Sequence, residues 1–156
     1  MPATSKHDTP DVITLPPLIF AAGGIAGILL NMLIPLSILP DWLRWAGIVL
    51  VVLSLIPGPW ALLNMMRAGT HPEPTHPTTA LVTNGPFRFS RNPIYLTFTL
   101  FFLGFALITL NLWLIAILPV VLIVLIKGVI EREECYLERK FGEDYRVYKG
   151  RVRRWI

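Results

Sequence analysis

Residues 94–130 read IYLTFTLFFLGFALITLNLWLIAILPVVLIVLIKGVI, and this stretch decides the fold class. It divides into two apolar runs, 94–110 and 112–130, which are separated by Asn111 alone. Each run is just long enough to cross about 30 Å of hydrocarbon as a helix that rises about 1.5 Å per residue. The sequence therefore predicts two transmembrane helices joined by a tight antiparallel hairpin.

Two further apolar runs precede this hairpin, at residues 12–39 and 42–66. The first contains no charge, and its GGIAG stretch (23–27) suits close contact between helices. The second includes the segment Pro57-Gly58-Pro59, which should bend it. Hydrophobic residues make up 54% of the chain and the mean hydropathy is +0.60, too apolar for a soluble domain. We expect an all-α integral membrane bundle of four transmembrane helices.

Basic residues are distributed unequally about these four spans. Of the 14 Lys and Arg residues, 13 lie in or beside the N-terminus, the loop 68–92 and the C-terminal tail, and only Arg44 lies opposite. The positive-inside rule then places both termini in the cytoplasm of a multi-pass protein, in bacteria the inner membrane. The first run lacks the short apolar core and cleavage site of a signal peptide, so it is a retained span. Residues 1–11 form a cytoplasmic tail and 12–156 a single domain.

Several other classes of protein and site are excluded. The sequence pI is about 9.6, but the basic residues form no isolated arm with interleaved aromatics, so we expect no nucleic-acid partner. Cys135 is the single cysteine, which rules out an intrachain disulfide. No Cys/His cluster has the spacing of a zinc site, and we expect no metal. The sequence leaves the oligomeric state open.

The polar side chains are concentrated in two segments predicted to share one side of the membrane, the loop 68–92 and the tail 131–156. Residues 131–149 should form cytoplasmic helices separated at Gly142, a suitable C-cap. The ending RVRRWI (151–156) is basic and aromatic, which suits an anionic membrane surface. Together these segments can cover the mouth of the bundle and enclose a pocket.

Charged residues from both segments reach this predicted pocket. The loop ends in GPFRFSRNPIY (85–95), where Arg91 precedes a helix N-terminus suited to a ligand carboxylate. Glu133 and Glu134 arrive at the same level from the other arm of the hairpin, and a carboxylate beside aromatic rings suits a cation. The residues predict a site for a zwitterionic or cationic small molecule. The alternative is that Arg91 pairs with Glu133 or Glu134 only to close the hairpin.

These segments also resemble a known family. The stretch LVTNGPFRFSRNPIY (81–95) is followed by Glu133-Glu134, FGEDY (141–145) and RVRRW (151–155). In order and spacing this pattern resembles the isoprenylcysteine carboxyl methyltransferase and phospholipid methyltransferase group of membrane enzymes, and most of all its short bacterial members. The resemblance covers roughly residues 75–156. It implies a methyltransferase that uses S-adenosyl-L-methionine.

In that family an Arg-His-Pro-x-Tyr motif and a later Glu-Glu motif hold S-adenosylmethionine. Carried over by position, the resemblance implies that Arg91 and Glu133 are catalytic and that Glu133 also binds the cofactor. Asn92 replaces the motif's His; it can form hydrogen bonds but does not titrate near neutrality, so a binding role remains and a general-base role does not. The remaining cofactor-binding residues implied in this way are Thr79, Ala80, Leu81, Val82, Phe87, Pro93, Ile94 and Tyr95.

The acceptor is where this sequence departs most from the family. Val129 stands four residues before Glu133, where the family has an Arg that helps to bind the acceptor carboxylate. Arg132 is the only basic side chain placed to substitute, so Val129 and Arg132 are the candidate substrate residues. A buried carboxylate needs a cationic partner. We therefore expect a small or lipid-like acceptor with a neutral or lipid-borne nucleophile.

Other functions remain possible at the level of sequence. Within the methyltransferases, a phospholipid amine, a thiol and a prenylcysteine-like carboxylate are all candidate acceptors. From other classes, the chain could be a non-catalytic membrane scaffold or a small transporter. The transporter is disfavoured because the spans lack the intramembrane charge that ion transport usually requires.

Overall fold

The computed structural model describes residues 9–36, 38–73 and 76–156. Within these residues every regular element is helical, which confirms the all-α prediction. The elements are α1 (Pro16–Leu33), α2 (Leu43–Ser54), α3 (Pro57–Arg67), the 3-10 helix η1 (Gly85–Arg88), α4 (Pro93–Ile108), α5 (Leu112–Leu125), the π-helical turn η2 (Ile126–Ile130), α6 (Glu131–Phe141) and α7 (Glu143–Arg151). Of the predicted N-terminal tail, residues 1–8 lie outside the described residues.

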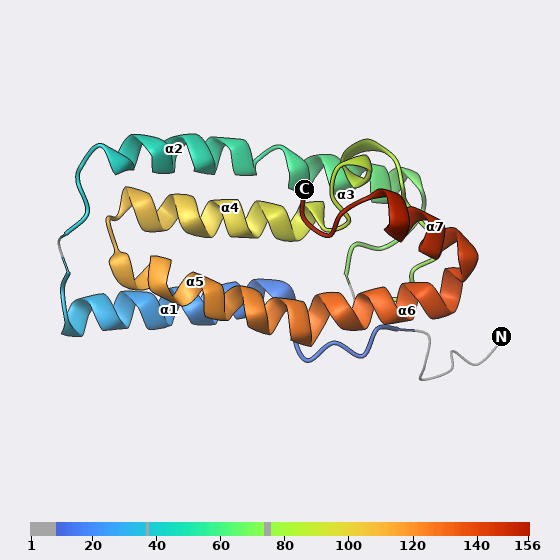
Figure 1. Cartoon of the computed structure of the whole chain (residues 1–156), viewed down its shortest axis with the longest axis horizontal. Coiled ribbons are helices and arrows are strands. Elements are labelled where there is room, and N and C mark those ends of the chain that lie inside the picture. Colours follow the sequence, from blue (N-terminus) through green and yellow to red (C-terminus); the bar gives the residue numbers. More distant parts are fainter. Residues whose placement is uncertain (1–8, 37, 74–75) are drawn as a thin grey trace.

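The long helices form an elongated bundle in which α4 lies between α2 and α5 (Figure 1). Helix α1 packs along α5, and α2 packs along α4. At one end of the bundle α3, the loop 68–92, α6, α7 and the C-terminal segment gather together (Figure 1). This end holds most of the polar residues, as predicted, and we refer to it as the polar end.

Among the described residues, three helices are long and apolar enough to cross a membrane: Pro16–Leu33, Leu43–Arg67 and Leu112–Phe141. The helix of the third predicted span (94–110), α4, has only 16 residues and rises about 24 Å at about 1.5 Å per residue. The count of four crossings therefore remains a prediction. The bend expected at Pro57 is confirmed, because α2 ends at Ser54 and α3 begins at Pro57.

The structure corrects two boundaries. The first span was predicted over 12–39, but its helix covers only Pro16–Leu33. Residues 12–15 run outside the helix, and Ile13 N donates to the carbonyl of Gly128 at 3.1 Å. The fourth span was predicted to end at residue 130, yet the helix continues through η2 into α6. From Glu131 on, the helix carries charged side chains that favour water over hydrocarbon. This change in side chains does not interrupt the backbone hydrogen bonds of the helix.

The predicted hairpin between the third and fourth spans is confirmed. Only Thr109, Leu110 and Asn111 connect α4 to α5, with Leu110 at a φ of 50°. The side chain of Asn111 accepts hydrogen bonds from the amides of Trp113 and Leu114, at 3.0 and 3.2 Å, and so caps α5. Its Nδ2 also donates to the Gly27 carbonyl at 3.3 Å, which ties the hairpin to α1.

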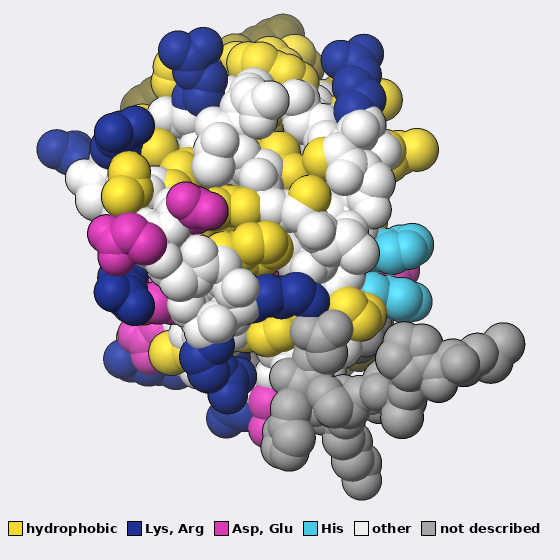
Figure 2. All heavy atoms as spheres, turned by 90° about the vertical axis from the view of Figure 1, so that its right-hand side faces the viewer, with side chains coloured by type: hydrophobic (Ala, Val, Ile, Leu, Met, Phe, Trp, Pro, Cys, Tyr) yellow, Lys and Arg dark blue, Asp and Glu magenta, His cyan; other side chains and the backbone are white. Residues whose placement is uncertain are grey.

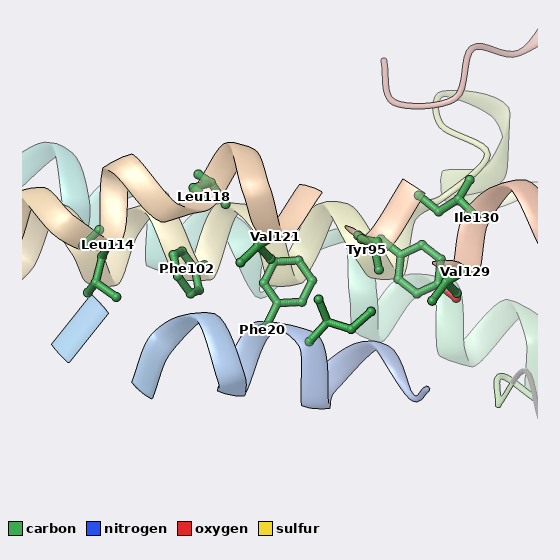
Figure 3. Packing of buried hydrophobic residues seen from close by; sticks show 11 residues of the cluster. Phe20, Tyr95, Phe102, Leu114, Leu118, Val121, Val129 and Ile130 are labelled. Carbon is green, nitrogen blue, oxygen red and sulfur yellow. The ribbon is translucent and has the colours of Figure 1, made fainter. Parts of the chain in front are cut away.

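A buried cluster fills the bundle from this hairpin to the polar end. Leu114, Leu118 and Val121 of α5 face Phe102 of α4 and Phe20 of α1. Figure 3 shows the same cluster reaching Tyr95, Val129 and Ile130 at its other end. The hydrophobic core of the bundle thus ends against residues of the candidate site.

Helices α2 and α4 approach most closely at two glycines. A Cβ atom added to Gly104 would lie 2.8 Å from the carbonyl oxygen of Gly47 and 3.0 Å from the Val51 amide nitrogen. Both are backbone atoms, so the new methyl group can be accommodated only if the helices move apart. Small residues at such contacts allow close packing between helices in membranes.

We predict that Gly104→Ala lowers the stability of the detergent-solubilised protein by about 1–3 kcal/mol, the usual range for overpacking. Gly150→Ala is the matched control, because nothing lies within 4 Å of an added Cβ there. Thermal unfolding followed by circular dichroism would measure both. Equal unfolding temperatures for Gly104→Ala and the unmodified protein would show that the two helices are not in contact at this position.

Candidate active site

A cavity opens at the polar end of the bundle between the loop 68–92, the start of α4, and helices α6 and α7. The space within it, counted out to the solvent at its mouth, is about 850 Å³. Figure 2 looks onto this end and shows acidic and basic side chains around hydrophobic ones. The structure thus has a cavity between the loop and the C-terminal helices, and its use as a cofactor pocket remains a prediction.

Most of the residues predicted from the sequence line this cavity. Thr79 does not: its amide donates to Thr70 Oγ1 at 3.1 Å and its hydroxyl to the Gly69 carbonyl at 2.7 Å, so it closes the loop instead. Its neighbour Thr78 lies on the cavity wall. The predicted residues that line the cavity are Ala80, Leu81, Val82, Phe87, Arg91, Asn92, Pro93, Ile94, Tyr95 and Glu133.

Tyr95 and Glu133 form one wall of the cavity. Pro93 occupies the first turn of α4, where its missing N–H removes no helical hydrogen bond. Tyr95 lies two residues further along the same turn. The Tyr95 hydroxyl donates to Glu133 Oε1 at 2.6 Å. This contact depends on the uninterrupted helix from α5 to α6, which carries Glu133 past the end of the apolar run to the level of α4's first turn.

Glu134 is shared between two arginines. Arg154 binds it with both arms of its guanidinium group, Nε to Oε1 at 3.0 Å and Nη2 to Oε2 at 2.9 Å. Arg91 Nη1 lies 3.1 Å from Oε1, and the side chains of Arg91 and Glu134 are only 11% and 8% exposed. The alternative considered from the sequence, that Arg91 pairs with a glutamate across the hairpin, therefore describes part of this site.

Arg91 keeps unused hydrogen-bonding capacity in this arrangement. Among the described residues, its buried Nε and Nη1 atoms have no acceptor in good geometry. A buried donor left without a partner costs about 1–3 kcal/mol, and more when it is charged. Because Arg91 lines the cavity, an anionic ligand group could satisfy these donors.

The C-terminal segment 151–156 contacts this site, although none of its residues was among the predicted site residues. The amide of Arg91 donates to the Arg153 carbonyl at 3.0 Å, and Asn92 Nδ2 donates to the Arg154 carbonyl at 3.0 Å. The hydrogen bonds to Glu134 raise the pKa of the Arg154 guanidinium above its usual value. The sequence assigned the whole ending RVRRWI to a membrane surface, and no spacing rule distinguishes the inward-facing Arg154 from the exposed Arg153.

Three tyrosines that the sequence did not assign to the site also line the cavity. The Tyr148 hydroxyl donates a hydrogen bond to the Phe87 carbonyl at 2.8 Å, and the Tyr136 hydroxyl accepts one from the Thr78 amide at 3.1 Å. Burial raises the pKa of Tyr145 to about 12, with a smaller contribution from the Glu134 charge, and burial raises that of Tyr148 as well. Both hydroxyls in α7 are therefore neutral at physiological pH, and they are suited to hydrogen bonding and ring contact.

The two candidate substrate residues lie away from the cavity. Val129 is fully buried in the hydrophobic cluster, at the end where Figure 3 also shows Tyr95. Arg132 is exposed, and its Nη1 donates to the carbonyl of Asp11 at 2.6 Å. The structure therefore does not bring Val129 or Arg132 together with Arg91 and Glu133.

Comparisons with known proteins relate this geometry to a family. The family model described as phospholipid methyltransferase matches residues 42–144, about two thirds of the chain. The match runs from the start of α2 to the start of α7, and it includes Arg91, Tyr95, Glu133 and Glu134. An uncharacterized protein of Haemophilus influenzae is 47% identical over 55 residues, which cover 32% of this chain and 87% of that protein. No solved structure matches the chain.

Proposed function

This chain belongs to the phospholipid methyltransferase family, and from that premise we propose that it transfers a methyl group from S-adenosylmethionine to a small or lipid-like acceptor at the cytoplasmic face of a membrane. Membership of the family implies a membrane methyltransferase, and the apolar helices agree with a membrane protein. The identity of the donor, the acceptor and the membrane face are the parts that we propose.

The observation that carries the proposal is the set of groups around the cavity. Arg91 offers unsatisfied donors, which suit the carboxylate of the methionyl part of the cofactor. The Glu133 carboxyl group, hydrogen-bonded to Tyr95, suits a cationic ammonium or sulfonium group. The apolar side chains of Leu81, Val82 and others in the loop suit the adenine ring. These residues fit S-adenosylmethionine in charge and polarity.

S-adenosylmethionine, when bound, supplies a methyl group on a sulfonium that a nucleophile displaces in line, so the protein's task is to position the reactants. Arg91 and Glu133 would do so by holding groups of opposite charge at separate points of the cavity. Asn92 uses its amide to hold the Arg154 carbonyl. That contact favours an orienting role for Asn92 and agrees with its inability to act as a general base near neutral pH.

For the acceptor we propose a neutral or lipid-borne nucleophile. Val129 is buried and apolar, and Arg132 points to Asp11, so neither supplies a cation beside the cavity. A phospholipid amine and a thiol fit this condition better than a prenylcysteine-like carboxylate. A non-catalytic scaffold and a small transporter are disfavoured by membership of a methyltransferase family.

We propose that the polar end of the bundle faces the cytoplasm, in bacteria at the inner membrane, on the 13-to-1 distribution of basic residues. Cys135, the single cysteine, is exposed on α6 two residues after Glu133 and can report the side on which the site lies. We expect a membrane-impermeant maleimide to label Cys135 only after cells are permeabilised. Asp41→Cys in a Cys135→Ser background is the control for the opposite end and should react in intact cells. Reversed labelling of the two positions would place the site outside.

The main test of the proposed function is binding of the cofactor. S-adenosylmethionine or S-adenosylhomocysteine should raise the unfolding temperature of the solubilised protein, because a ligand that prefers the native state stabilises it. Glu133→Gln and Tyr95→Phe should reduce this shift, whereas Glu143→Gln, which changes an exposed residue paired with Arg146, should not. Absence of any shift in the unmodified protein at millimolar ligand would contradict the proposal.

The acceptor can be tested with labelled cofactor and a panel that contains an ethanolamine lipid, a small thiol and a prenylcysteine. We expect the prenylcysteine to be the poorest acceptor, since a buried carboxylate without a cationic partner is unfavourable by about 2–5 kcal/mol. Arg132→Ala should leave the order unchanged. Preferred turnover of the prenylcysteine, retained in Arg132→Ala, would refute the argument from Val129.

A further inference from the structure

The carboxylate of Glu134 is divided unequally between its two arginines. Arg154 takes both oxygens in a bidentate contact, with donor distances of 3.0 and 2.9 Å. Within the part of the chain that the structure describes, Arg91 is left with an ion contact at Oε1, 3.1 Å long, and its Nε and Nη1 lack an acceptor in good geometry. Bidentate arginine–carboxylate pairs are strong and directional. Arg154 therefore restrains a carboxylate that Arg91 would otherwise bind in the same way.

The two arginines differ in their access to ligand. Arg91 and Glu134 line the cavity, whereas Arg154 does not and acts from behind Glu134. Two guanidinium groups share one carboxylate here, with Glu131 Oε1 at 4.0 Å from Arg154 Nη1 as a more distant anion. The group of Arg91, Glu134 and Arg154 therefore has one more cation than anion, and Arg91 is the arginine that lines the cavity.

The segment that carries Arg154 is itself fixed to the site. Its carbonyl accepts hydrogen bonds from Asn92 Nδ2 at 3.0 Å and Ser90 Oγ at 3.3 Å, and the neighbouring Arg153 carbonyl accepts the Arg91 amide. Trp155, which follows, packs against the hydrophobic cluster. The position of the Arg154 guanidinium relative to Glu134 is thus set by the same residues that set the position of Arg91.

We propose that Arg154 is a positioning residue that holds Glu134 by both oxygens and so keeps the Arg91 guanidinium available for the carboxylate of the bound ligand. The inference rests on the proposed function, because it takes that ligand to be an S-adenosylmethionine-like amino acid. It concerns a residue outside the part of the chain that the family model matches, residues 42–144. Without Arg154, Glu134 would turn to Arg91 and neutralise it.

The test compares two adenosine ligands that differ in the amino-acid part. S-adenosylhomocysteine carries a carboxylate, and 5′-methylthioadenosine lacks it. We expect Arg154→Gln to weaken binding of S-adenosylhomocysteine by about tenfold or more, since hydrogen bonds to charged groups contribute that much. The affinity for 5′-methylthioadenosine, which has no carboxylate, should change by no more than about twofold by the same reasoning. Isothermal titration calorimetry on the full-length solubilised protein measures both. Arg153→Gln, an equal loss of charge at an exposed neighbour, should change neither affinity.

A second substitution separates positioning from general damage. In Glu134→Gln/Arg154→Gln no carboxylate remains to capture Arg91, so binding of S-adenosylhomocysteine should recover toward that of the unmodified protein. If Arg154→Gln does not fold, Arg154→Lys keeps the charge without the two-armed contact, and it should weaken S-adenosylhomocysteine alone.

Unchanged affinity for both ligands in Arg154→Gln, or in Arg154→Lys where that variant replaces it, would overturn this inference. An equal loss of both ligands, or no recovery in the double variant, would overturn it in favour of a purely structural role. Failure of the unmodified protein to bind either ligand would instead overturn the proposed function, and this inference with it.

Discussion

The uninterrupted helix from Leu112 to Phe141 is the constraint on which the rest of the structure depends. A backbone in hydrocarbon must satisfy its own hydrogen bonds, and a continuous helix does so along its whole length. Because it does not stop where the apolar sequence stops, this helix carries Glu133 and Glu134 out of the bundle on a rigid support. The π-helical turn at Ile126–Ile130 lies between the apolar and the polar part, as such turns often do at functional sites.

The loop and the C-terminal segment are organised around this support. The first turn of α4 meets the first turn of α6 through Tyr95 and Glu133, and α7 returns Tyr148 to the carbonyl of Phe87. The N-terminal segment meets the same helix from another side, with the Ile13 amide at the Gly128 carbonyl and Arg132 at the Asp11 carbonyl. Each of these contacts joins residues that are far apart in the sequence. Each involves either the helix Leu112–Phe141 or residues that line the cavity beside it.

Charge at the polar end is arranged to serve a ligand as well as the fold. A buried carboxylate such as Glu134 is tolerated when it is paired, and Arg154 pairs with both of its oxygens. Arg91 is a second buried cation beside the same carboxylate. Such an excess charge on the wall of a cavity is more easily explained by binding than by folding, and it agrees with a methyl donor that carries a carboxylate.

The sequence by itself determined the helical class, the hairpin at Asn111 and the bend before Pro57, because apolar periodicity and proline act locally. It placed Arg91 and Glu133 together because the two arms of one hairpin must end at the same level, whereas most of the cavity wall was implied by the resemblance to a family. Only the tertiary structure decided that Arg154 faces inward while Arg153 is exposed, that Tyr136, Tyr145 and Tyr148 complete the cavity, and that Arg132 points away. The placement of these side chains depends on how far each helix continues and on which of its faces packs against its neighbours. Contacts between segments remote in sequence determine both properties, and no local sequence pattern indicates those contacts.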